Sequence, residues 1–217
     1  RISKPEFVGG IFRVRKSGAS PVQDPWGKDV DFATKSAEAL IPLLKEARPQ
    51  VRRQAFEQLV LRGKRSIAPL SDLLKASDDG DLRLKACWIL GQLGGEAGRS
   101  AVRSALSDKD FRVRVAAARM SGLEGDRQAI PMLSALLFDP EAPVRRQAAT
   151  SIGRLNGVEA GYMLYMASAY AVDPHEAHAI TYATIQLGLE KVARLALKHT
   201  HPNVRRTAAI SLDQMKD

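Results

Sequence analysis

The feature that most constrains the fold of this chain is an internal repeat of 31 residues. A hydrophobic residue followed by arginine recurs at Val51-Arg52, Leu82-Arg83, Val113-Arg114 and Val144-Arg145, always 31 residues apart. The pair returns at Val204-Arg205, nearly two periods later. We therefore expect a further unit beginning near residue 175, with His178 or Ala179 at the place of the arginine. A period of this length is typical of stacked repeats that bury a core only together.

Each repeat has the pattern of two helices. In the second unit, Leu82, Ala86, Leu90 and Leu93 are spaced as on one face of a helix. Glycines that favour a left-handed helix end follow the first helices at Gly63, Gly94, Gly125 and Gly157. Second helices are expected over residues 66–76, 96–107, 127–138, 158–172 and 189–198. The pattern predicts an all-α protein, a right-handed α-solenoid of about six helical hairpins over residues 31–217.

The amino-acid sequence of the repeats also indicates a family. Residues 139–153 read DPEAPVRRQAATSIG, and residues 108–122 read DKDFRVRVAAARMSG. Both resemble the HEAT repeat in its short, phycobilisome-lyase-like form. The resemblance covers residues 32–217 and implies a scaffold that binds and spaces other molecules.

Composition narrows the classes of partner and of site. The chain has 217 residues, a net charge of +9 and a pI near 9.9, which favours anionic partners. Its single cysteine, Cys87, excludes an internal disulfide and is best interpreted as a small core residue. No apolar run is long enough to cross a bilayer. Because residue 1 is arginine, we expect the chain to be part of a longer protein.

The periodic arginines have two interpretations. Five of six units carry one, at Arg52, Arg83, Arg114, Arg145 and Arg205. They could form a ladder that grips phosphates along a groove. Alternatively, each pairs with aspartate or with backbone carbonyls in the turns between repeats. We favour this second, structural interpretation because the arginines are locked to the structural period.

A second set of basic residues lies on the second helices, which line the concave face in many solenoids. The set is Lys75, Arg99, Arg103, Arg127, Lys191, Arg194 and Lys198. It predicts a basic groove and, as an alternative function, binding of a polyanion such as the nucleic-acid backbone. The aromatic residues that usually stack on bases are missing from this set.

Segment 158–172 is the candidate surface for docking a protein partner. It contains Tyr162, Met163, Tyr165, Met166 and Tyr170, and no charge follows Glu159. Tyrosine and methionine are enriched where proteins dock on one another. The alternative is that this helix is more deeply buried than its neighbours.

The sequence provides little for catalysis or metal binding. His175, His178, His199 and His201 cluster late, but neither pair has an accompanying cysteine or a glutamate that would act as general base. No catalytic triad and no phosphate-binding loop is found. We therefore predict no catalytic, cofactor-binding or metal-binding residue in this segment.

Residues 1–30 form an extended leader that differs from the rest. Residues 10–15, GIFRVR, alternate like a β-strand, and Asp-Pro-Trp-Gly follows at residues 24–27. This wording resembles the junction in membrane-bound dehydrogenases of planctomycetes, where a β-propeller ends and HEAT repeats begin.

The resemblance implies a setting for the chain. Residues 10–15 would be the last propeller strand, and Trp26 would pack the linker against the first repeat. The chain would be a non-catalytic spacer in an exported or periplasmic dehydrogenase-like protein. Its partners would be the neighbouring propeller and a C-terminal cytochrome-like domain.

Overall fold

The computed structural model describes residues 17–18, 20 and 22–215, and within these ranges all regular structure is helical. The all-α solenoid expected from the repeats is therefore confirmed. The strand predicted at residues 10–15 lies outside the described residues. No helix in the described part of the chain is both long and apolar enough to cross a membrane.

The helices form five consecutive pairs, with one half-pair on each side. The first helices of the pairs are α2 (Pro49–Leu61), α4 (Gly80–Leu93), α6 (Phe111–Leu123), α8 (Ala142–Arg154) and α10 (Pro174–Gln186). The second helices are α3 (Ile67–Ala76), α5 (Gly95–Ser104), α7 (Ile130–Leu136), α9 (Gly161–Ala167) and α11 (Glu190–Ala196). The pairs are preceded by α1 (Ala37–Leu40) and followed by α12 (Pro202–Gln214). Short 3-10 turns extend several second helices, including η3 (Ala105–Ser107) and η6 (Ser168–Tyr170).

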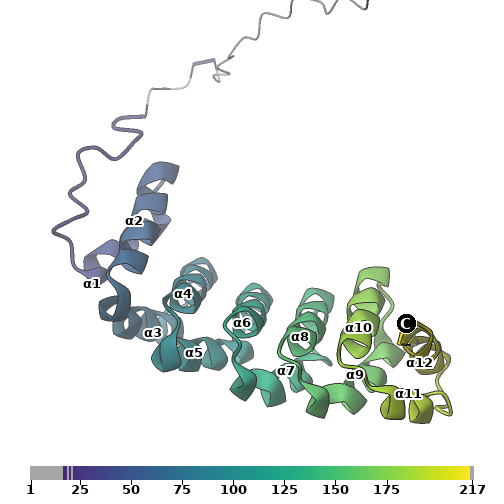
Figure 1. Ribbon diagram of the computed structural model, residues 1–217. Coiled ribbons are helices and arrows are strands. Elements are labelled where there is room, and N and C mark those ends of the chain that lie inside the picture. Colours follow the sequence, from purple (N-terminus) through teal and green to yellow (C-terminus); the bar gives the residue numbers. More distant parts are fainter. Residues whose placement is uncertain (1–16, 19, 21, 216–217) are drawn as a thin grey trace, which may run out of the picture.

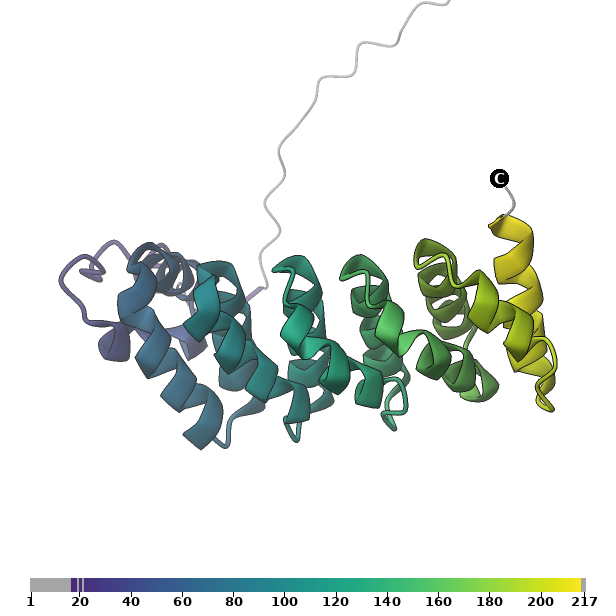
Figure 2. The ribbon, with the colours of Figure 1, turned by 60° about the horizontal axis from the view of Figure 1, so that its bottom comes forward.

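The helices lie in two layers that bend together. In Figure 1 the first helices, α2 to α12, form the inner side of the bend, and the second helices form the outer side. Helix α2 stands at a steep angle to the row that begins with α4. Figure 2 shows the outer layer from α3 to α11 in front of the row of first helices. The inner side is therefore built by first helices, where we expected second helices.

The turns between pairs start the first helices in the same way. A side-chain oxygen of Asp79, Asp110 or Asp173 accepts backbone N–H groups at the start of α4, α6 or α10. At the other end, glycines adopt positive φ as predicted, except after α8. There Asn156 takes the left-handed conformation (φ 52°), and Gly157, which we expected in this role, does not. Asparagine tolerates this conformation better than most residues.

Small residues allow the first helices to approach one another closely. We call the hydrophobic residue that precedes the periodic arginine the apolar anchor of its helix. The position nine residues after this anchor is glycine in α4, α6 and α8, at Gly91, Gly122 and Gly153. A Cβ atom on Gly122 would stand 2.7 Å from the Ser151 Oγ of the next first helix. In α10 the corresponding position is Ile185, and α12 packs less extensively on α10 than α10 does on α8.

The described part of the leader is fastened to the start of α2 by hydrogen bonds to the Asp24 carboxylate and to the Trp26 carbonyl. Arg48 donates to the Asp24 carboxylate at 3.1 Å, and Gln54 donates to the carbonyl of Trp26 at 3.1 Å. Phe32 is buried, whereas the Trp26 side chain is 58% exposed. The Trp26 carbonyl takes part in this attachment, and the Trp26 side chain, which we expected to pack the linker against the first repeat, is more than half exposed.

Candidate interaction surfaces

The periodic arginines connect one repeat to the next. Arg83 donates from Nε and Nη2 to the two carboxylate oxygens of Asp108, both at 2.8 Å, and from Nη1 to the carbonyl of Ser77 at 2.9 Å. Arg114 repeats this arrangement with Asp139 and with the carbonyl of Asp108. Because Asp108 bonds to both arginines, these contacts form a continuous arginine ladder along the turns.

The other periodic arginines keep the carbonyl contact, but their carboxylate partner is missing or is a different residue. Arg52 and Arg205 donate to the carbonyls of Glu46 and His199, each six residues earlier. Arg145 donates to the carbonyl of Asp139 at 2.8 Å, but its carboxylate partner is Glu176, at 2.6 and 2.8 Å. These bonds occupy the guanidinium groups of Arg83, Arg114 and Arg145 within the protein, as the structural interpretation describes.

The rung at α10 differs from the others, and one residue is inserted before this helix. Asp108 and Asp139 each stand two residues before the first-helix cap and accept the N–H of the capping residue. Ala171 occupies this place before α10 and has no acceptor side chain. Glu176 instead occupies the apolar anchor place and is fully buried. Ala177, rather than His178 or Ala179, stands where the arginine would be.

The buried rungs are electrostatically balanced. Burial disfavours the charged form of Asp108, but hydrogen bonds from Arg83 and from the Asp110 N–H outweigh it, and the pKa of Asp108 is lowered overall. The side chains of Arg83 and Asp108 are only 4% and 8% exposed. Such a pair is costly to break from one side, because the remaining charge stays buried.

The basic residues of the second helices do not form a concave groove. These helices lie on the outer side of the bend, so Lys75, Arg99, Lys191, Arg194 and Lys198 do not line its inner side. Arg103 is largely buried and donates to Asp126 at 2.7 Å and to Glu96 at 2.6 Å. Arg127 bonds to the carbonyl of Leu155 and to Glu159, and Arg194 bonds to Glu190.

The five aromatic and methionine residues around α9 divide between core and surface. Tyr165 is fully buried, and Met163 and Met166 are half-buried against the core. Tyr162 and Tyr170 are 63% and 66% exposed, and Tyr170 contacts Phe138 edge to face. Only these two tyrosines therefore remain available to a partner.

The histidines and the cysteine have structural surroundings. His199 and His201 each accept a backbone N–H before α12, and His178 stacks on Tyr182. No group of three or more metal-ligating side chains occurs in the part of the chain that the structure describes. Burial raises the pKa of the Cys87 thiol to about 12, so this cysteine is a poor nucleophile.

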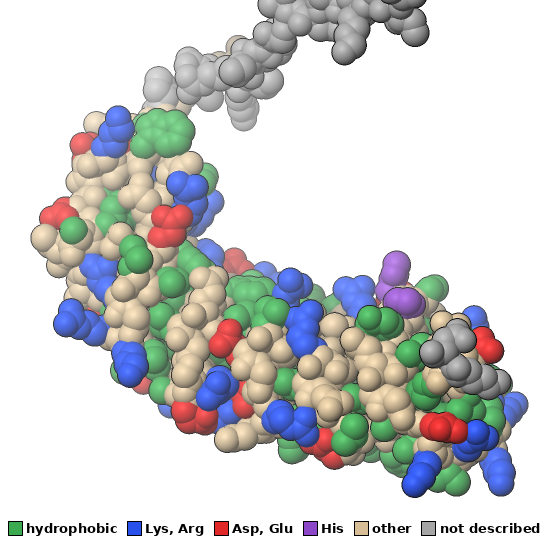
Figure 3. Space-filling model, viewed as in Figure 1, with side chains coloured by type: hydrophobic (Ala, Val, Ile, Leu, Met, Phe, Trp, Pro, Cys, Tyr) green, Lys and Arg blue, Asp and Glu red, His purple; other side chains and the backbone are tan. Residues whose placement is uncertain are grey.

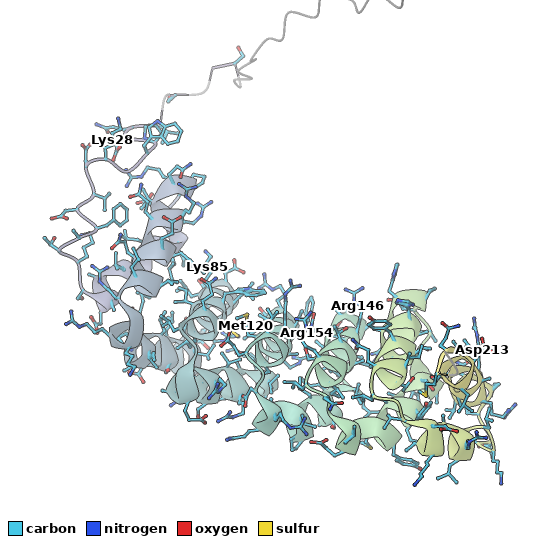
Figure 4. All side chains as sticks on the ribbon, viewed as in Figure 1. Lys28, Lys85, Met120, Arg146, Arg154 and Asp213 are labelled. Carbon is cyan, nitrogen blue, oxygen red and sulfur yellow. The ribbon has the colours of Figure 1, made fainter. Side chains whose placement is uncertain are left out.

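One set of residues escaped the sequence analysis. Arg119 of α6, Arg146 and Arg154 of α8, and Arg206 of α12 are exposed on first helices. They lie two, six or ten residues after the apolar anchor, positions that point away from the core. Figure 4 labels Arg146 and Arg154 on α8. The spacing of these arginines from the anchor is present in the sequence and would have predicted them.

Comparison with protein families identifies the repeats. The family profile described as HEAT repeats matches residues 37–110, 67–153 and 100–185. The phycocyanobilin lyase subunit alpha of a Picosynechococcus species is 42% identical over 73 residues, which is 33% of this chain. The matching region spans only 27% of that lyase subunit.

Solved structures share the solenoid fold. The complex of CpcE and CpcF of phycocyanin lyase from Nostoc sp. PCC7120 aligns with a TM-score of 0.54 and 20% identity, over 92% of this chain and 79% of the other. The Escherichia coli protein YibA aligns with a TM-score of 0.57 and 18% identity, over 93% and 77% of the two chains. At these identities the similarity shows the fold alone.

Proposed function

Because the chain belongs to the HEAT-repeat family, we propose that it is a non-catalytic scaffold for protein interaction within a larger, exported, dehydrogenase-like protein. The observation that carries the proposal is the arginine ladder. It bonds successive repeats together from Ser77 to Glu176, which favours a stiff stack with long exposed faces. Such a stack is suited to holding partners at fixed positions.

The relatives support a role in binding proteins. One is named as a subunit of a lyase, and a structural neighbour is a complex of CpcE and CpcF. On this chain, Tyr162 and Tyr170 are large, exposed and aromatic, as is typical of residues that anchor a protein interface.

The leader supports the proposed parent protein. Its sequence over about residues 5–30 resembles the propeller-to-HEAT junction of planctomycete dehydrogenases. The partners would then be the propeller on one side and a cytochrome-like domain on the other, in the periplasm or outside the cell. The segment would hold no cofactor of its own and would set the distance between those domains.

Reading the open reading frame on both sides of this segment tests the parent. We expect propeller-like repeats upstream and a Cys-x-x-Cys-His motif downstream. A frame without either would overturn the dehydrogenase setting, and the scaffold role would then have to stand on binding data alone.

The scaffold role is tested with the flanking domains expressed separately. We expect them to bind this chain in titration calorimetry, and we expect Tyr162→Ser together with Tyr170→Ser to weaken binding by about tenfold. Leu195→Ser on α11, which removes a side chain 72% exposed, is the matched control. Equal affinity of all three proteins would exclude these tyrosines, and no binding would overturn the scaffold role.

Binding of a nucleic-acid backbone is the second candidate function. It is favoured by the four exposed arginines of the first helices, which are part of the net charge of +9. Duplex DNA is therefore included in the binding test below.

A further inference from the structure

The inner side of the bend carries an unusual charge pattern. Arg119, Arg146, Arg154 and Arg206 are exposed there, and no described carboxylate lies within ion-pair distance of them. Other arginines, such as Arg103 and Arg114, are paired. In Figure 3, Lys and Arg side chains follow one another along the inner edge up to the histidines near α10. These four positions define what we call the inner arginine row.

Acidic residues are missing from the same positions. In the first helices from α4 to α12, none of the residues two, six or ten places after the anchor is aspartate or glutamate. In α10 these places are counted from Glu176, which occupies the anchor position. On the outer layer, by contrast, Glu190 and Glu159 accompany Arg194 and Arg127. The inner side therefore attracts negative charge, whereas much of the outer charge is compensated locally.

Apolar and aromatic side chains alternate with the inner arginine row. Leu123 and Ile210 are 48% and 41% exposed, and Tyr182 is 53% exposed beneath the stacked ring of His178. Arginine, tyrosine and apolar residues together are typical of protein interfaces. A nucleic-acid backbone would leave the apolar part of this surface without a partner, whereas an acidic polypeptide offers both kinds of side chain.

A pocket of about 380 Å³ opens at one end of the row, between α10 and α12. Its lining includes His178, Thr181, Asn203 and Arg206. The one acid in the lining, Asp173, accepts the His175 N–H at the start of α10. A guanidinium and an amide beside a pocket of this size fit a carboxylate side chain.

The contact between α10 and α12 also differs in sequence from the other contacts between first helices. The glycines that bring the first helices together in α4, α6 and α8 are replaced in α10 by Ile185. A branched side chain at this position prevents the close approach that glycine allows. Deeper in the same contact, Thr184 and Ser211 meet through their hydroxyl groups at 2.6 Å. The pair that leaves this pocket open, α10 and α12, is thus the pair without the glycine contact.

We propose that the inner side of the bend binds an acidic polypeptide segment, with one carboxylate side chain in the pocket beside Arg206 and others on Arg119, Arg146 and Arg154. This inference rests on the proposed scaffold function and names the chemistry of a partner. The apolar side chains of the segment contact Leu123, Ile210 and the Tyr182 ring.

Fluorescence anisotropy with defined probes tests the proposal. The probes are a labelled peptide that repeats Glu-Glu-Leu-Gly, its analogue with Gln for Glu, and a short DNA duplex. We expect the acidic peptide to bind this chain, and we expect Arg146→Glu with Arg206→Glu to weaken it about tenfold or more. Asn203→Asp, which adds a like charge in the pocket, should weaken it about threefold.

The matched control moves the same charge change to the outer layer. Lys191→Glu with Lys198→Glu alters net charge equally on exposed residues of the other face, and should change affinity less than about twofold. Equal loss in both double variants, or equal binding of the Gln analogue, would overturn the proposal. Binding of DNA but not of the acidic peptide would replace it with the nucleic-acid function, and binding of neither would overturn both. The reading-frame test above is independent of these results.

Discussion

The middle repeats and the repeat that begins with α10 use different residues to pair a carboxylate with the periodic arginine of the preceding repeat. In the middle, Asp108 and Asp139 lie in the turns and pair with Arg83 and Arg114. At α10 the turn holds Ala171, and the acid that pairs with Arg145 is Glu176, in the place where other first helices bury an apolar anchor. The ion pair is kept, and the apolar anchor is given up for it.

This difference shows which part of the repeat is essential to the stack. An arginine that bonds to the carbonyl six residues earlier is present in five first helices, whereas its acid partner moves or is absent. The carbonyl bond closes the turn within a repeat, and the carboxylate ties one repeat to the next. The departure at α10 also coincides with the pocket between α10 and α12.

Removing a middle rung should have the largest effect. Asp108→Ala leaves Arg83 buried without its carboxylate and leaves the Asp110 N–H without its acceptor. We expect the free energy of unfolding to fall by about 4 kcal/mol, measured by urea denaturation. Arg112→Ala, which removes an arginine side chain that is 49% exposed, is the control and should cost less than about 1 kcal/mol.

The pH dependence of a second variant at the same position, Asp108→Asn, gives an independent measurement of the ion pair. The pKa of Asp108 is lowered in the folded protein, so its contribution is complete above the unfolded value of about 4 and is lost as pH falls through the folded value. The stability difference between the natural protein and Asp108→Asn should therefore shrink as the solution is acidified below about pH 4. A difference that stays constant down to acid unfolding would show that the ion pair contributes nothing.

Moving α10 towards the pattern of the middle repeats should lower the free energy of unfolding by a smaller amount, and a second substitution should reverse that loss. Glu176→Val recreates the apolar anchor but leaves Arg145, whose side chain is 13% exposed, without a carboxylate. We expect a loss of about 3 kcal/mol in urea denaturation. Adding Ala171→Asp should recover most of it, because the aspartate stands where Asp108 and Asp139 stand.

Ala171→Asp alone is the control for this exchange. With Glu176 still present, a second acid has no free guanidinium and should stabilise nothing. If the double variant were no more stable than Glu176→Val, the two kinds of rung would not be equivalent.

The sequence predicted what depends on period and local chemistry. The 31-residue spacing identified the helices and the anchors such as Val113 and Val144, because burying one face in every unit fixes that spacing. It also indicated that the periodic arginines bond within the turns. The unit without arginine was expected near residue 175, and α10 begins at Pro174.

What could not be predicted depends on the relation between repeats. Before α10, where one residue is inserted, the acid that pairs with Arg145 is Glu176 and does not lie in the turn, and no local pattern shows that exchange. Which layer lies inside the bend depends on how the repeats pack on one another, and the pattern within a single repeat does not show this. The prediction that the second helices line the inner side was therefore wrong. Asn156 replaced a glycine in the helix end because either residue accepts positive φ.

The smallest expected change in stability comes from a substitution of Tyr165, which lies in the core beside the pocket. The Tyr165 hydroxyl is buried near Ser211 and Thr184, but has no hydrogen-bond partner in acceptable geometry, and burial raises the pKa of this tyrosine. Removing an unpaired buried hydroxyl removes its desolvation cost, so Tyr165→Phe should leave stability unchanged or raise it by about 1 kcal/mol in thermal and urea unfolding. Tyr182→Phe, on the exposed side of α10, is the control and should change nothing measurable. A loss of about 1 kcal/mol or more for Tyr165→Phe would mean that the Tyr165 hydroxyl makes a hydrogen bond, and would contradict this prediction.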